Sequence, residues 1–185
     1  YASARLMKTG QTTSYRTGDD GDIEAGRETD FFTLKENNPF GNTNRFTDEL
    51  GGATYTNNWV IDWSTFDGLS VLGYYRVAQI AASWNNAIDN SLGTFGTFSG
   101  CRLWNINEAM NIMRHSSAHP FNYSPINIST TSNIWTSTTR PSATNAAYYI
   151  NNAGGYWFVT ANQDKSVGMQ YVAVRTFSVS GTTLT

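Results

Sequence analysis

The sequence predicts an α+β fold, and the order of its elements is the main reason. A turn-rich β region comes first, two helical segments follow near the middle, and the last third is again β-rich. Strands and helices do not alternate regularly, as they would in a parallel sheet. The 185 residues suit one domain over 1–185, which is long enough to bury a core without disulfides.

The N-terminal β region is marked by glycine turns and short apolar segments. Gly51 and Gly52 separate residues 45–47 from residues 53–56, a pattern that predicts a β-hairpin. Residues 59–63 follow, and their aromatic and β-branched side chains favour a strand.

Two segments carry helical signals. Over residues 77–92 the apolar side chains recur at intervals of three and four, which predicts one amphipathic helix that ends at Gly93. A second helix is expected to begin after Asn105, because Glu108 stands three residues later in the capping-box arrangement.

The C-terminal region is expected to be antiparallel. Four strands are predicted, with a turn at residues 151–155 and a polar loop at residues 162–168 between them. The predicted strands cover residues 134–138, 147–150, 156–159 and 170–177.

A series of short motifs, in order along nearly the whole chain, resembles the Lcl C-terminal domain family of bacterial and phage modules. The segment Trp84-Asn85-Asn86-Ala87 resembles the family's helix of tryptophan, polar pair and alanine. Cys101, Trp104 and Ala173 depart from the family's usual tryptophan, proline and arginine. The other matching segments are residues 8–15, 18–22, 44–48, 63, 101–108, 134–139 and 171–175.

This resemblance implies a C-type-lectin-like fold, in which two helices flank a small antiparallel sheet and long loops carry the binding site. It also implies an adhesive head at the C-terminal end of a longer stalked protein, often a homotrimer. The expected ligand is a glycan or a host surface receptor. The expected location is extracellular, on a bacterial cell surface or on a virion as part of a phage tail fibre.

The composition favours a neutral ligand. Only 14% of the residues are charged, below the roughly 25% usual in soluble domains. With 12 basic and 14 acidic residues the chain has no basic surface to gather phosphates, so nucleic acid is not expected. No apolar run approaches the roughly 20 residues that span a bilayer, so membrane insertion is not expected either.

The ligand-binding site is predicted at Trp157 and at the polar residues 162–165 that follow it. An aromatic side chain, amides and charged groups on adjacent segments are the combination that polar recognition uses. Trp157 could equally belong to the core, because aromatic strand residues usually pack. The predicted site residues are Trp157, Asn162, Gln163, Asp164 and Lys165.

Two clusters raise the question of a metal. Asp20, Asp22 and Glu24 alternate along the chain and could direct their oxygens at a calcium ion, although an ordinary solvated turn explains them as well. His115 and His119 have a spacing that could hold zinc on a helix, but Pro120 argues against a helix there.

Catalytic motifs are missing from the sequence, and we therefore expect a non-enzymatic protein. Asp62 and Asp67 could form a glycosidase pair, and Cys101 could suggest a formylglycine-generating enzyme, which however uses paired cysteines. An enzyme of either kind remains the alternative function. A ligand-free trimerisation cap is the third possibility.

Overall fold

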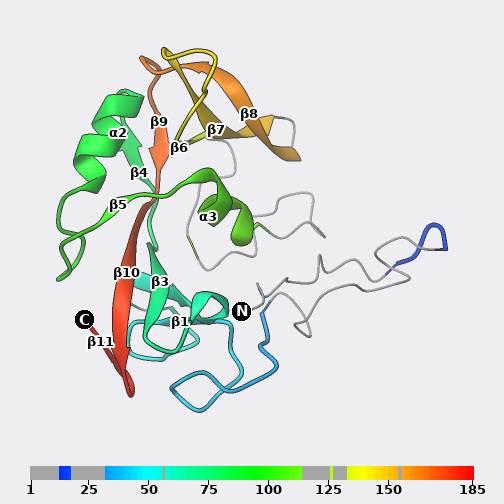
Figure 1. The fold of residues 1–185 in the computed structure, drawn as a ribbon, viewed down its shortest axis with the longest axis vertical. Coiled ribbons are helices and arrows are strands. Elements are labelled where there is room, and N and C mark those ends of the chain that lie inside the picture. The colour runs from blue at the N-terminus through cyan, green and yellow to red at the C-terminus, as the bar shows by residue number, and fades with distance from the viewer. Residues whose placement is uncertain (1–12, 18–31, 56, 114–125, 127–132, 154–155) are drawn as a thin grey trace.

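The computed structural model describes residues 13–17, 32–55, 57–113, 126, 133–153 and 156–185, and the side chains of residues 152–162 lie outside this description. Its strands form two sheets, one above the other along the long axis of the molecule (Figure 1). In chain order they are β1 (Phe46–Asp48), β2 (Trp59–Asp62), the 3-10 helix η1 (Trp63–Thr65), β3 (Ser70–Tyr75), β4 (Gln79–Ala81), α2 (Trp84–Ser91), β5 (Arg102–Leu103), α3 (Ile106–Asn111), β6 (Ile134–Thr139), β7 (Ala146–Ala153), β8 (Tyr156–Asp164), β9 (Met169–Tyr171), β10 (Ala173–Ser180) and β11 (Thr183–Leu184).

The lower sheet of Figure 1 has the strand order β1-β2-β3-β10-β11, and β5 pairs with the upper part of β10. All of these pairs are antiparallel. The upper sheet has the order β4-β9-β6-β7-β8, in which β6 and β9 run parallel and the other pairs antiparallel. Val172 alone separates β9 from β10, so the chain passes there directly from one sheet into the other.

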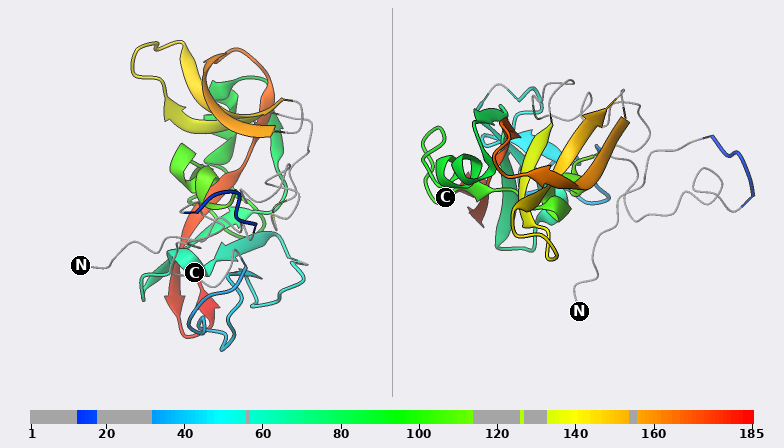
Figure 2. Two further views of the ribbon diagram at one scale, coloured as in Figure 1. Left: turned by 90° about the vertical axis from the view of Figure 1, so that its right-hand side faces the viewer. Right: turned by 90° about the horizontal axis from the view of Figure 1, so that it is seen from above.

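The expected fold class was wrong. The described residues form mostly strands in two sheets, and the two α-helices are short and do not flank a single small sheet. Figure 2 shows the strongly curled upper sheet above the lower one. Strands of two to four residues are too short to give a periodic sequence signal, which is why the sequence led us to undercount them.

The predicted helix over residues 77–92 is correct only in its second half. Ser83 Oγ accepts a hydrogen bond from Asn86 N, so that α2 begins at Trp84. The residues before the cap form β4, where Ile80 pairs with Gln170 and is 80% exposed. The second helix begins as predicted, since the Asn105 and Glu108 side chains form the capping box of α3.

The predicted hairpin around Gly51 and Gly52 is also wrong, because β1 pairs with β2 and not with residues 53–56. The Asp48 carboxylate closes this loop by accepting hydrogen bonds from Leu50 N and Gly52 N. Gly51 has a φ of 85°, and a Cβ there would lie 2.4 Å from the Phe40 ring. The glycine pair therefore serves a compact loop.

Four buried tryptophans are divided between two core clusters, Trp104 and Trp135 in one and Trp59 and Trp63 in the other. Each indole N–H donates a hydrogen bond to an acceptor in another segment. Trp59, Trp63, Trp104 and Trp135 are at most 1% exposed. The bond from Trp104 Nε1 to Trp135 O is 2.7 Å long, and the bond from Trp135 Nε1 to Val167 O is 3.1 Å long. Fixed indoles of this kind anchor loops as well as fill space. The turn after β8 is thereby attached to the core.

Candidate functional site

A concave region of the upper sheet combines amide and aliphatic side chains, and we call it the amide hollow. Its volume is about 270 Å³. It is formed by β4, β8, β9, the residue before β6 and the turn that joins β8 to β9, all in the upper half of Figure 1. The lining residues are Ile80, Asn133, Gln163, Val167, Gly168, Met169 and Gln170.

Strand pairing brings these distant segments together. Gln170 lies opposite Ile80 across the β4–β9 pair, and its backbone N–H donates to Asn133 O at 3.0 Å. Gly168 lies against β4, where an added Cβ would be 3.3 Å from Ala81 O. Together with the bond from Trp135 Nε1 to Val167 O, these contacts fix the positions of Gln170, Gly168 and Val167.

Gln170, one of the lining residues, carries an unpaired polar atom. Gln170 Oε1 is buried and accepts no hydrogen bond, and it is the one such side-chain atom in the described part of the chain. An acceptor of this kind costs about 1–3 kcal/mol compared with a satisfied one. Buried polar groups are nearly always paired, so Gln170 Oε1 is a place where a donor from water or from a ligand can bind.

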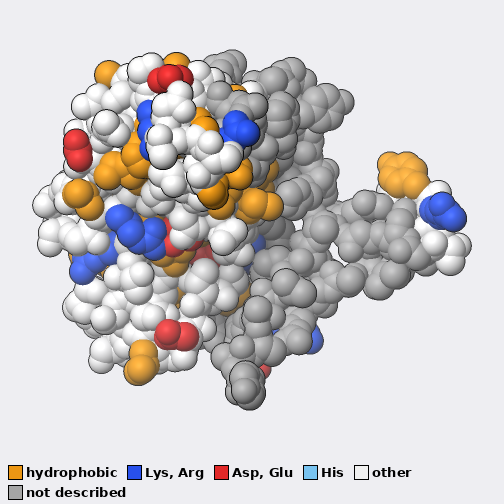
Figure 3. All heavy atoms as spheres, turned by 45° about the horizontal axis from the view of Figure 1, so that its top comes forward, with side chains coloured by type: hydrophobic (Ala, Val, Ile, Leu, Met, Phe, Trp, Pro, Cys, Tyr) orange, Lys and Arg blue, Asp and Glu red, His pale blue; other side chains and the backbone are white. Residues whose placement is uncertain are grey.

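Apolar groups surround the amides. Ile80 is 80% exposed and Val167 is 36% exposed, and both line the hollow. Over the top of the molecule the charged side chains are few and scattered among uncharged ones (Figure 3). The hollow can therefore bind a small ligand by combining aliphatic contact with amide hydrogen bonds.

The residues predicted for the site have different positions. Gln163 lines the hollow. Asp164 stands next to it and accepts a 2.8 Å hydrogen bond from Ser166 N, which lowers the pKa of this exposed carboxyl. Lys165 Nζ donates to Thr144 O at 2.8 Å and lies 4.2 Å from the Trp84 ring centroid. Trp157 and Asn162 belong to β8, and their side chains lie outside the described residues.

Gln163 is the one lining residue that the sequence predicts, and the other six are not predicted. Ile80 lies in the segment expected to be helical, and Gln170 lies in a predicted strand with no binding role. The one sequence signal for Gln170 is a polar side chain between two apolar ones, Met169 and Tyr171. Both of these neighbours are buried in the structure.

The residues considered for catalysis have structural roles. Asp62 is completely buried, and its carboxylate accepts hydrogen bonds from Arg45 Nε at 2.9 Å and from Arg45 Nη2 at 2.8 Å. Asn111 Nδ2 donates to the same carboxylate at 2.9 Å. Asp67 is exposed and accepts from the backbone N–H groups of the turn that follows it. Cys101 is buried and free.

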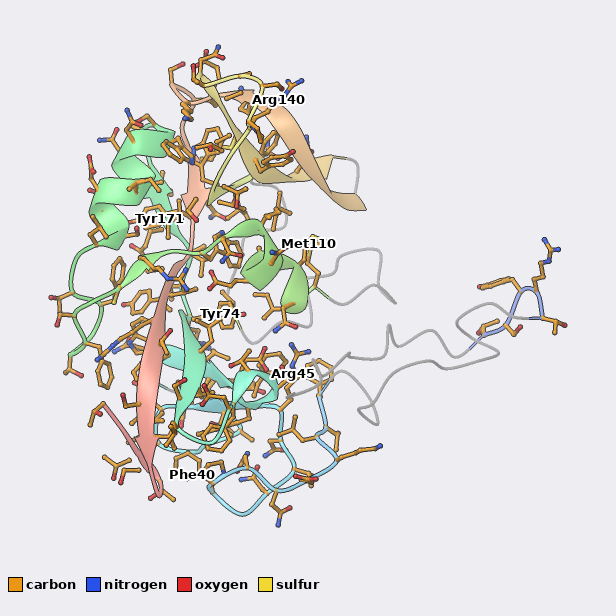
Figure 4. All side chains as sticks on the ribbon, viewed as in Figure 1. Phe40, Arg45, Tyr74, Met110, Arg140 and Tyr171 are labelled. Carbon is orange, nitrogen blue, oxygen red and sulfur yellow. The ribbon has the colours of Figure 1, made fainter. Side chains whose placement is uncertain are left out.

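A second polar hollow, of about 340 Å³, lies between β3 and α3, near the labelled Tyr74 in Figure 4. Burial raises the pKa of the Tyr74 hydroxyl well above its usual value, and that hydroxyl donates to Glu108 O at 3.2 Å. Glu108 itself is engaged by Arg102 and by the backbone of Asn105. These groups are committed to the capping of α3 and to its attachment to the lower sheet.

Asp20, Asp22 and Glu24, the predicted calcium residues, lie outside the described residues, as do His115 and His119. Within the described ranges no three His, Cys, Asp or Glu side chains come together in a way that could hold a metal. In the same ranges no helix has both the length and the apolar character needed to cross a bilayer. Neither a protein-family model nor a curated protein matches the chain.

Proposed function

We propose that this chain is a non-enzymatic binding head that recognises a glycan, or another hydroxyl-bearing surface ligand, through the amide hollow. The observation that carries the proposal is the unpaired acceptor at Gln170. A ligand hydroxyl in the hollow would supply the donor that the protein lacks, after a rotation of the amide about its last side-chain torsion. An extracellular setting and a homotrimer, which only the sequence resemblance implied, belong to the same proposal.

The size and chemistry of the hollow suit a single sugar ring. Its volume of about 270 Å³ lies just below the roughly 300–1,000 Å³ usual for small-molecule sites. Ile80 and Val167 offer aliphatic surface for the C–H face of a ring, and Gln163 and Gln170 offer amides for its hydroxyls. A large cofactor would not be accommodated.

The surrounding contacts keep the hollow in shape before a ligand arrives. Trp84 N donates to Lys165 O at 2.8 Å, and the Lys165 ammonium rests on the Trp84 ring. A preformed site loses less conformational entropy on binding, which favours affinity for a small ligand.

The test is a Gln170→Met variant of the purified chain, assayed on immobilised oligosaccharides and by calorimetry. Methionine keeps the length of the side chain and removes the unpaired acceptor. We expect binding to weaken about threefold to tenfold, because one hydrogen bond is lost. We also expect the free domain to become more stable by about 1 kcal/mol, because an unpaired buried oxygen disappears.

Gln79→Met is the matched control. Gln79 precedes Ile80 in β4 but does not line the hollow. Its amide donates to Val77 O at an exposed position. The control variant should leave binding unchanged. The proposal fails if Gln170→Met binds the oligosaccharide as well as the unmodified chain does, or if the folded chain binds none.

A further inference from the structure

We infer that the amide hollow selects neutral saccharides that donate a hydroxyl or acetamido hydrogen to Gln170, and that it discriminates against acidic glycans. This inference rests on the proposed function and names the ligand class for that site. It makes Gln170 and its uncharged surroundings the determinants of specificity.

The lining itself gives the first argument. The seven described residues that line the hollow are all uncharged. Asn133, Gln163 and Gln170 carry amides, while Ile80 and Val167 are aliphatic. A carboxylate or sulfate that entered such a hollow would give up water and gain no opposite charge from this lining, which is costly. A neutral hydroxyl meets no such penalty.

The charges beside the hollow give the second argument, because they leave no net attraction for an anion. Asp164 follows Gln163 directly and is exposed, and the hydrogen bond from Ser166 N lowers its pKa. Lys165, the adjacent cation, donates to Thr144 O and lies over the Trp84 ring. Neither charged residue lines the hollow, and their opposite charges offset one another.

The hydrogen-bond polarity of Gln170 defines which part of a ligand it can contact. Oε1 can only accept, so its partner must carry an O–H or N–H group. Sugar hydroxyls and acetamido groups carry such hydrogens, and acidic glycans carry them too. Gln170 therefore selects for a donor group, and the discrimination against acidic forms comes from the uncharged lining.

The experiment compares matched oligosaccharides on the full chain: neutral cores with and without N-acetyl groups, and the same cores sialylated or sulfated. We expect at least one neutral core to bind and its acidic forms to bind about tenfold more weakly. Binding of the neutral core should change little between low and high salt, since it involves no ion pair.

Asp164→Asn provides a second readout, because asparagine can still accept from Ser166 N. This variant should reduce the ratio of the affinity for the neutral core to the affinity for its acidic form by about twofold to threefold, as expected for an exposed charge. If an acidic form binds more tightly than its neutral core, and Gln170→Met abolishes that binding, this inference is overturned and the proposed function stands. A folded chain that binds no member of the panel would overturn the proposed function as well.

Discussion

At the residue scale, the feature of the scaffold with the largest desolvation cost is the buried ion pair between Arg45 and Asp62. Both side chains are completely inaccessible to solvent. Arg45 Nη2 also donates to Asn111 O at 2.8 Å, and Asn111 Nδ2 donates back to Asp62. The pair thus connects β2 to the end of α3, and its value lies in satisfying several polar groups at once.

We predict that Arg45→Met destabilises the domain by about 3–5 kcal/mol, because Asp62 would be left buried without its cation. A double variant that also carries Asp62→Leu should regain part of this loss, since the unpaired charge is then absent. The rest should persist, because Asn111 Nδ2 and Ser64 N lose their acceptor. Urea denaturation of the two variants measures the difference. A loss below about 1 kcal/mol in the single variant would contradict this account of the pair.

At the scale of elements, α2 supports the turn that forms one wall of the amide hollow. The Ser83 cap fixes where the helix begins, and Trp84 at its first position contacts Lys165 through the ring and through the backbone. Trp84 Nε1 donates to Thr136 O at 2.7 Å, which attaches the helix to β6. The beginning of α2 and the turn therefore form one unit.

We predict that Ser83→Ala lowers the free energy of unfolding by about 0.5–2 kcal/mol, as the loss of an N-cap does. Ligand affinity should fall with it, because the turn after β8 rests on Trp84. Ser83→Asp should preserve both properties, since aspartate caps equally well. Equal melting temperatures for the alanine variant and the unmodified chain would show that the cap has no such role.

Helix α3 and strand β4 show what local sequence can and cannot predict. The capping box at Asn105 and Glu108 depends on residues three apart and was found in the sequence. Strand β4 was missed because Val77 and Ile80 have helical spacing, although they are 47% and 80% exposed. Its strand conformation depends on pairing with β9, about ninety residues later, which no local pattern encodes.

At the scale of the whole molecule, the amide hollow exists because the strand order brings β4, β9 and β6 together at one end of the molecule. The sequence pointed to residues 162–165, of which Gln163 lines the hollow, although residues 162–164 belong to β8 and not to a loop. It could not supply Ile80 or Gln170, because their proximity follows from the long-range register of the sheet.

The central claim is that a neutral saccharide binds in the hollow and satisfies Gln170. The most direct measurement is an NMR titration of the isotope-labelled chain with an oligosaccharide that it binds, followed at the glutamine side-chain amides and the backbone. We expect the Gln170 side-chain resonances to shift most, together with the backbone of Ile80 and Val167. Shifts confined to the opposite end of the molecule, with Gln170 unmoved at saturation, would contradict the account.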